Sequence, residues 1–449
     1  MKISKERQLF DNRALVALII PLIIEQFLAV LVGMADSIMV ASVGEAAVSG
    51  VSLVDNIVVL LINIFSALAT GGAVVAGQYL GRKREDEACK SAGQLVWFIT
   101  ISALVVTAIV YLCKSFILHG VFGKIEPDVM AHANTYLMIV TASIPFIALY
   151  NGGAAIFRAM GDSKIPMIVS MIMNVINVSG NAILIYGFHC GTEGVAIPTL
   201  VSRAVAAILI TILLCNQKRV LHLEKTFRYR FDGEMVKNIL KIGVPNGLEN
   251  SMFQLGKILV LSLVSTFGTY AIAANAVSNA VAMFQILPGM SINLAIITVI
   301  SRCVGARDYE QVKYYTRKLH IITYAWMVVE NIIIALLIPT ILRIYHLSDL
   351  TAQTTEQILL FHAVAAVTIW PLSFSLPCTL RAAGDVQYTM YMSIFSMWIF
   401  RIAFSYILGK YMGLGVFGIW VAMVIDWIFR AICFVIRYLG EKWKHKATV

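Results

Sequence analysis

The chain of 449 residues repeats itself at an offset of about 224 residues. Four pairs that fall in register are Pro21 with Pro245, Glu25 with Glu249, Gly44 with Gly268, and Gly81 with Gly305. One residue off that register, the motif RAMGD at 158–162 falls on RAAGD at 381–385. A duplication of this length predicts two halves with one common fold, and any functional residue kept in only one half becomes conspicuous.

The composition predicts a polytopic helical membrane protein. Hydrophobic residues make up 59% and charged residues 13% of the chain, whereas soluble domains carry about 25% charged residues. The mean hydropathy is +0.82, and apolar runs of about 20 residues or more recur along the whole chain. We therefore expect an all-α integral membrane fold with twelve spans, at about 14–40, 48–79, 91–113, 132–157, 165–188, 194–215, 239–266, 272–303, 316–340, 357–380, 388–412 and 415–436.

Charge placement predicts how the spans are oriented. With both termini inside, inner segments hold about 27 of the 35 Lys and Arg residues. The outer loops hold only Lys114, Lys124, Arg343 and Lys410. Six spans in each half then make the two repeats parallel, with a central cavity between them as the substrate path. We expect a first lobe at 1–225, a second lobe at 226–449, and a cytoplasmic linker around 216–238.

Several function classes are disfavoured by the same sequence. The net charge of +10 comes from basic residues in short loops on one side of the membrane, so a nucleic-acid partner is not expected. The seven cysteines are scattered singly, which supports neither a disulfide framework nor a structural metal site. No P-loop, GxSxG or HExxH motif occurs, so we expect no enzyme, no cofactor and no ATP-driven step.

Asp36 is the acid at which the repeat breaks, because Val260 occupies the matching position. A carboxylate within a membrane span is costly and therefore needs a reason. Asp36 could bind a proton or cation from an internal cavity, or it could be hydrogen-bonded to a neighbouring helix near the outer interface. The asymmetry with Val260 favours a functional role. Asp55 is a second candidate, since its register partner Asn279 is neutral.

Three glutamates in the spans are secondary candidates. Glu25 and Glu249 each follow a proline by four residues, and their symmetry favours a shared structural role. Glu249 and Lys257 are eight residues apart, too far for direct contact along a helix, so Glu249 is expected to be free to bind cations in the second lobe. Glu330 lies centrally in the ninth span, where a bare charge is too costly, so it is either protonated or paired. We favour a pair with Lys257 or Arg401.

An amide-rich helix face belongs to the first half only. Asn177 and Asn181 are one turn apart in the fifth span, and Thr199 lies in the sixth. This polar lining could serve a site, or it could hold neighbouring helices together by hydrogen bonds. The register partner of Asn177 is Arg401.

Several segments resemble the multidrug and toxic compound extrusion (MATE) family, with bacterial NorM and DinF transporters among its members. They are PLIIEQFLAVLVGMADSIMVASVG, GQYLGRKREDEA, RAMGDSKIP, NVINVSGNAILIYG, GVPNGLENSMFQLGKI and LRAAGDVQYTM. The resemblance covers nearly the whole chain. It implies twelve helices in two six-helix lobes, and export of organic, often cationic, compounds such as drugs and dyes in exchange for H⁺ or Na⁺.

The resemblance also implies a set of site residues in the first lobe. Asp36 matches the first-span acid of the cation site, where Na⁺ could bind, and the other matching positions are Tyr136, Asn177, Asn181 and Thr199. Asn181 departs from members with Asp at this position, which removes one negative charge. The tenth span, TIWPLSFSLPC, is neutral where some members carry an acid. Coupling is therefore expected in the first lobe.

Two other functions compete with export. A flippase for a lipid-linked precursor should need cationic side chains for phosphate, and Lys257 and Arg401 are the main candidates. A membrane receptor or scaffold does not require a polar interior, which transport explains better. For the exporter we expect a monomer in the cytoplasmic membrane with both termini cytoplasmic. Pro21, about four turns before Asp36, is a candidate hinge of the first helix.

Overall fold

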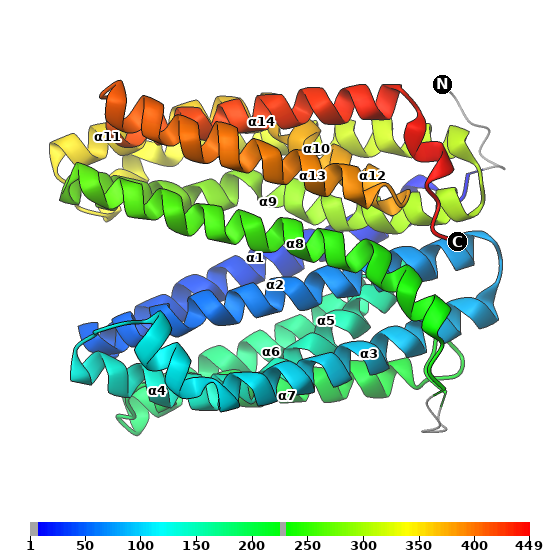
Figure 1. Cartoon of the computed structure of the whole chain (residues 1–449), viewed down its shortest axis with the longest axis horizontal. Helices are drawn as coiled ribbons and strands as arrows, with labels where there is room; N and C mark the ends of the chain where they lie inside the picture. The colour runs from blue at the N-terminus through cyan, green and yellow to red at the C-terminus, as the bar shows by residue number, and fades with distance from the viewer. Residues whose placement is uncertain (1–7, 225–229) are drawn as a thin grey trace. The chain divides into compact units, whose positions relative to one another are not determined.

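The computed structural model describes residues 8–224 and 230–449, and these residues form helices joined by short loops, without a strand (Figure 1). The first helices are α1 (Asn12–Val43), α2 (Glu45–Gly81), α3 (Glu85–Leu112), α4 (Pro127–Thr141), α5 (Ile144–Ala159), α6 (Lys164–Ala182) and α7 (Glu193–Leu214). They are followed by α8 (Gly233–Val264), α9 (Thr269–Gly305), α10 (Tyr309–Ile344), α11 (Asp349–Thr368), α12 (Leu376–Ala382), α13 (Val386–Ser396) and α14 (Gly415–Leu439).

The expected twelve spans agree with these helices. Within the described residues, nine helices are long and apolar enough to cross a membrane, and two bent pairs, α4 with α5 and α11 with α12, raise the number to eleven. The twelfth position is α8, whose apolar residues are interrupted by polar ones such as Asn246, Glu249 and Lys257. Three segments of π-helix extend two spans: Ile183–Gly187 continues α6, and Met397–Ala403 and Ser405–Tyr411 both continue α13.

Two spans that the sequence predicts as single helices are bent. The fourth, expected at 132–157, breaks between α4 and α5 with a bend of 46°. The tenth, expected at 357–380, bends by 57° between α11 and the segment Pro371–Ala382. Proline explains both breaks, because Pro145 lies in the first turn of α5 and Pro371 begins a π-helical segment, and neither supplies a backbone donor to the preceding turn.

The duplication is visible in the backbone. Gly44 and Gly268 have φ of 142° and 101°, and each precedes a helix of 37 residues, α2 or α9. These are the second and eighth spans, whose expected ranges, 48–79 and 272–303, are the longest of the twelve. Gly161 and Gly384 in the repeated RAMGD and RAAGD motifs also share a positive φ, 86° and 91°. Glycine suits these turns because it lacks the Cβ that penalises positive φ.

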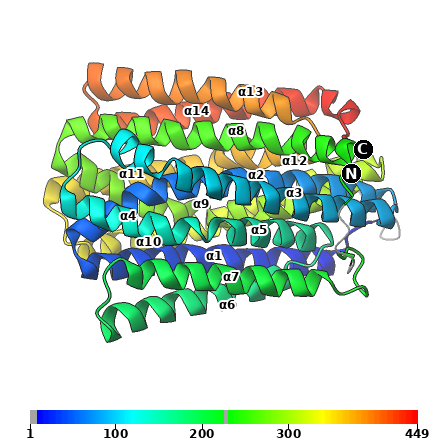
Figure 2. The same cartoon turned by 60° about the horizontal axis from the view of Figure 1, so that its bottom comes forward.

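The chain divides into two compact units. One is Val16–Gly247, and the other joins the segment that ends at Leu15 to Leu248–Val449. The expected linker at 216–238 includes residues 225–229, which lie outside the described residues, and its last part, from Gly233, already belongs to α8. In the first-named unit α6 and α7 lie side by side, as Figure 2 shows.

Each unit has its own apolar core. Val54, Tyr136 and Val140 belong to a buried cluster in the Val16–Gly247 unit. The other unit is built around tryptophans, with Trp370, Trp420 and Trp427 at most 4% exposed. The polar groups described next lie beside these cores, on helices whose remaining faces are apolar.

Candidate functional site

Asp36 is held by two amides of a neighbouring helix. Asn181 of α6 donates from Nδ2 to Asp36 Oδ1 at 2.8 Å. In the amide orientation that satisfies both neighbours, Asn177 Nδ2 donates to the two Asp36 oxygens at 2.9 and 3.1 Å, and its Oδ1 accepts from the Thr199 hydroxyl of α7 at 3.1 Å. The structure thus brings together four of the five residues expected at this site.

Tyr136, the fifth expected residue, donates its hydrogen bond elsewhere. Its hydroxyl donates to Asp55 Oδ1 at 2.9 Å, linking α4 to α2. Asp55 and Asp36 interact electrostatically, so the two acids belong to one charged group. Tyr136 is only 5% exposed, and its ring packs in the apolar cluster of this unit. The site therefore contains two carboxylates from α1 and α2, with Tyr136 attached to the second.

Arg203 of α7 is the cation of this group, and the sequence reasoning did not assign it a role. It interacts electrostatically with both Asp36 and Asp55, and its Nη1 donates to Ser143 Oγ at 2.8 Å. Its signal in the sequence was spacing, because Arg203 follows Thr199 by one helical turn and so shares its face. Two acids and one arginine leave one formal negative charge within the spans.

Oxygen atoms in this group remain available to a small cation. Asn181 is fully buried, yet its Oδ1 has no hydrogen-bond partner. Asp36 is half-buried and is not part of any ion pair among residues 8–224 and 230–449. Carboxylate and amide oxygens are the ligands that hard cations prefer. No cluster of three His, Cys, Asp or Glu side chains able to hold a metal ion occurs in the described part of the chain.

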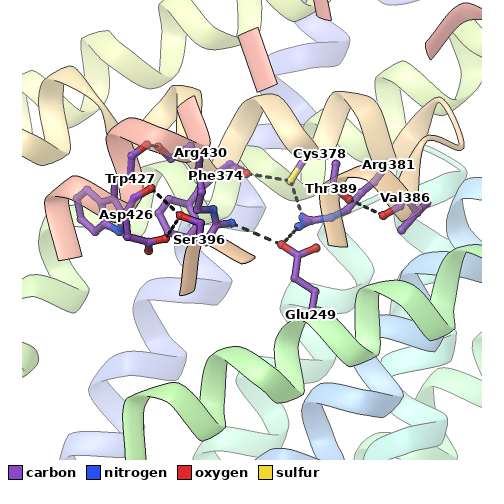
Figure 3. A network of polar contacts seen from close by, with 11 residues as sticks. Glu249, Phe374, Cys378, Arg381, Val386, Thr389, Ser396, Asp426, Trp427 and Arg430 are labelled. Carbon is purple, nitrogen blue, oxygen red and sulfur yellow. Dashed lines mark hydrogen bonds and ion pairs between the residues drawn. The ribbon is translucent and has the colours of Figure 1, made fainter. Parts of the chain in front are cut away.

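Glu25 and Glu249 bind the arginines of the repeated motifs. Arg158 Nη2 lies 2.7 Å from Glu25 Oε1, and Arg381 Nη2 lies 2.6 Å from Glu249 Oε1. Glu249 also meets Arg430 of α14 at 3.5 Å, as Figure 3 shows. The expectation that Glu249 is free of a basic partner is therefore wrong. Its partners come from α12 and α14, and helical spacing along α8 cannot reveal them.

Glu330 does not form the expected ion pair. Lys257 and Arg401 lie over the Phe253 ring instead, and neither forms an ion pair with Glu330 in the described structure. One Glu330 carboxyl oxygen is buried without a hydrogen-bond partner. The pairing was inferred from membership of the same half, which does not determine which helix faces meet. Pro21 lies inside α1, which continues from Asn12 to Val43, so its role as a hinge stays a prediction.

The comparisons with known proteins agree with the duplicated fold. The MatE family model matches residues 21–183 and again 245–407, in the same register as the Pro21–Pro245 pair. An uncharacterized transporter of Bacillus subtilis (strain 168), YisQ, is 28% identical over 440 residues, covering 95% of this chain and 94% of its own.

Other relatives extend over the same length. A probable multidrug resistance protein NorM of Thermotoga maritima is 24% identical and covers 98% of this chain and 94% of its own. A solved outward-facing structure of a multidrug resistance MATE family transporter of the MOP superfamily superposes with a TM-score of 0.88 at 21% identity, covering 98% of each chain. Since the two family matches span most of the chain, this protein belongs to the MATE family of membrane transporters.

Proposed function

We propose that this chain is a secondary active multidrug exporter that exchanges organic compounds for H⁺ or Na⁺, with the coupling ion bound at Asp36. The observation that carries the proposal is the Asp36 carboxylate, which is bound by α6 amides and has no ion-pair partner among the described residues. A carboxylate within a span is costly, so one that lacks an ion-pair partner indicates a binding or transport site. The names of the NorM relatives support export of drugs.

The coupling step follows from the hydrogen bonds around Asp36. A proton on the carboxyl group would remove an acceptor, so the amides of Asn177 and Asn181 would lose a charged partner. A Na⁺ ion would instead take oxygens from Asp36 and Asn181. Either event changes how α1 is bound to α6 and α7. An ion can shift the conformational equilibrium only if it favours one of these packings.

The protein would work as a monomer in the cytoplasmic membrane, with both termini in the cytoplasm. The excess of Lys and Arg on the side of the termini supports this orientation. The turnover is transport rather than covalent chemistry, and the polar residues of the site hold no nucleophile next to a base. Neither ATP nor a resident cofactor enters the cycle.

Transport in proteoliposomes tests the proposal. The purified chain is reconstituted, a pH or Na⁺ gradient is imposed separately, and flux of a cationic dye (ethidium) and an anionic dye (carboxyfluorescein) is followed by fluorescence. We expect flux of at least one dye to require one of the two gradients and to stop when an ionophore collapses it. Flux that is indifferent to both gradients, or absent for every compound of a wider panel, would refute ion-coupled export.

A further inference from the structure

The second repeat carries two basic residues where the first carries its acidic site. Val260 takes the place of Asp36, and Arg401 matches Asn177 at an offset of 224 or the adjacent Val178 in the one-residue-shifted register of the RAMGD and RAAGD motifs. Lys257 lies one helical turn before Val260 in α8. This region of the second repeat therefore lacks the carboxylate and carries two cations, Lys257 and Arg401, so the two repeats are suited to ligands of opposite charge.

Lys257 and Arg401 converge on one aromatic ring. Lys257 Nζ lies 5.0 Å and Arg401 Cζ 4.9 Å from the centre of the Phe253 ring. Their charged groups are therefore separated by no more than the sum of these two distances, although they come from α8 and from the π-helical segment Met397–Ala403. An anion with several oxygen atoms could interact with both.

The surrounding acids neutralise this pair only in part. Glu249 is shared by Arg381 and Arg430. Asp426 accepts a hydrogen bond from Ser396 (Figure 3). It also interacts electrostatically with both Arg401 and Arg430. With Lys257, the group holds four cations and two acids.

Most of the uncompensated charge lies at Lys257 and Arg401, because Asp426 is shared between Arg401 and Arg430. Neither residue takes part in an ion pair within residues 8–224 and 230–449, whereas Arg381 and Arg430 both do. Two neighbouring cations within spans repel each other and are costly there. An anionic ligand would reduce both costs.

The pair can be reached by a ligand. Lys257 is exposed and Arg401 is half-buried, in contrast to Arg430, which is 2% exposed. Lys257 also continues a polar stripe on α8 that begins at Asn246 and passes through Glu249. Phe253 packs edge-to-face on Phe374, with ring centres 6.4 Å apart, which supplies an apolar aromatic surface beside the cations.

We infer that Lys257 and Arg401 bind the anionic group, a carboxylate or phosphate, of an amphipathic aromatic compound whose apolar part packs beside Phe253 and Phe374. The inference rests on the proposed export function and names a substrate class for it. The first unit then takes the coupling cation at Asp36, while the second takes the negative end of the exported molecule. Charge-assisted hydrogen bonds to Lys and Arg supply the specificity for the anion.

Binding of three ring-matched probes tests the inference. Radiolabelled 1-naphthoate (anion), naphthalenemethanol (neutral) and naphthylmethylammonium (cation) are bound to the full chain in nanodiscs of zwitterionic lipid. We expect naphthoate to bind best, and Lys257→Gln with Arg401→Gln to weaken its binding by about tenfold or more while leaving the neutral probe unchanged. The charge-preserving Lys257→Arg with Arg401→Lys should retain a preference for naphthoate, which separates loss of charge from misfolding.

Lys318→Gln is the matched control, because Lys318 also lies over an aromatic ring, 5.4 Å from Tyr314, but outside this group. It should bind naphthoate like the unchanged protein. Equal naphthoate binding by the unchanged protein and the double Gln variant, or stronger binding of the cationic probe by the unchanged protein, would overturn the inference.

A lipid headgroup is the other source of the same chemistry. If phosphatidylglycerol in the nanodiscs displaces naphthoate from the unchanged protein, the anion site takes a lipid phosphate; if it does not, the site takes a free organic anion. Both results support the anion site. The test is independent of gradient-driven flux, so loss of ion coupling in the proteoliposome experiment would refute the exporter without affecting the binding result.

Discussion

Asp36 and Val260 occupy equivalent positions, and in the proposed function this difference assigns the coupling ion to the first repeat. We expect Asp36→Asn to keep the shape of the side chain but to remove its titration and its charge. Gradient-driven efflux should fall to the rate of protein-free vesicles, while insertion and elution from a sizing column stay unchanged. Dye flux in proteoliposomes is the measurement.

The control for Asp36 is Asp128→Asn, a change of the same chemistry at an exposed position in the first turn of α4. This variant should transport like the unchanged protein. Wild-type efflux by a well-expressed Asp36→Asn variant would show that coupling lies elsewhere, with Asp55 as the next candidate because it belongs to the same charged group.

Glu249 and Glu25 are equivalent in sequence but pair with different numbers of arginines. Glu249→Gln leaves Arg381 and Arg430 without their shared acid, whereas Glu25→Gln leaves only Arg158. Removing one partner of a buried ion pair costs about 3–5 kcal/mol. We expect both variants to lower the apparent unfolding temperature, and Glu249→Gln to lower it more.

Thermal unfolding of the two detergent-solubilised variants, followed by intrinsic fluorescence, measures this difference. Binding of a cationic dye to the same two variants separates a structural role from a binding role. Weaker dye binding by Glu249→Gln without a thermal shift would favour the expectation that Glu249 binds cations directly. Equal thermal shifts for both variants would mean that Arg430 contributes little to the pair.

At the scale of elements, Pro21 interrupts the backbone hydrogen bonds of α1 between its start and the Asp36 site. Loss of the Asp36 charge, or of its ion, would release the amides of α6 and allow the outer part of α1 to repack. Pro21→Ala restores the missing donor, so we expect ion binding to persist and turnover to slow.

Spin labels at Ser42 and Phe188, in a background lacking the seven native cysteines, report the distance between the outer ends of α1 and the segment that follows α6. Double electron–electron resonance at low and high pH, with and without Na⁺, should give two distance populations whose ratio changes. An unchanged distribution in active protein would rule out bending of α1 and favour rigid movement of whole lobes.

A second element-scale prediction concerns the contact between α2 and the first part of α8. A Cβ atom on Gly71 would lie 2.6 Å from the carbonyl oxygen of Ile239, so the two backbones approach closely at this point. Gly71→Ala should cost about 1–3 kcal/mol because the helices must separate. Gly93→Ala in α3 is the control, since its Cβ would meet nothing within 4 Å and should stabilise by about 0.4–1 kcal/mol.

Apparent unfolding temperatures of these two alanine variants should therefore shift in opposite directions. A neutral Gly71→Ala would mean that α2 and α8 pack less tightly than their backbone contact indicates. The comparison uses the same substitution in two helices, so differences in helix propensity do not account for the result.

The sequence was sufficient to predict the elements because apolar length and repetition are local signals. It located α2 and α9 as unusually long spans, and it placed Asp36 with Asn177 and Asn181 through the family resemblance. It could not give the bends after α4 and α11, since a proline within an apolar run is compatible with a straight, kinked or broken helix.

Contacts between distant helices were the part that sequence could not supply. The pairing of Glu249 with Arg381 and Arg430 depends on how α8, α12 and α14 pack, and no spacing along one helix encodes it. The expected partners of Glu330 failed for the same reason. The register difference at Arg401 was visible from the start, but its meaning needed the ring of Phe253 to place Lys257 beside it.

At the scale of the whole molecule, the distribution of Lys and Arg predicts that the two repeats enter the membrane from the same side. The inner segments hold about 27 of the 35 basic residues, including Arg84 in the loop between α2 and α3. The equivalent loop of the second repeat, between α9 and α10, lies just before Glu310. Parallel repeats require these two loops to share a side, whereas inverted repeats would separate them.

Single cysteines at Arg84, Glu310, Phe188 and Met412, in the cysteine-free background, test this topology with a membrane-impermeant maleimide. Phe188 and Met412 are 71% and 63% exposed and follow the π-helical ends of their spans, so both should react in intact cells. The cysteines that replace Arg84 and Glu310 should react only after permeabilisation. Labelling after permeabilisation also shows that all four cysteines are reactive. Labelling of the cysteine at position 84 but not of the one at position 310 in intact cells, or the reverse, would mean inverted repeats. Asp36 and Val260 would then no longer lie at the same membrane depth.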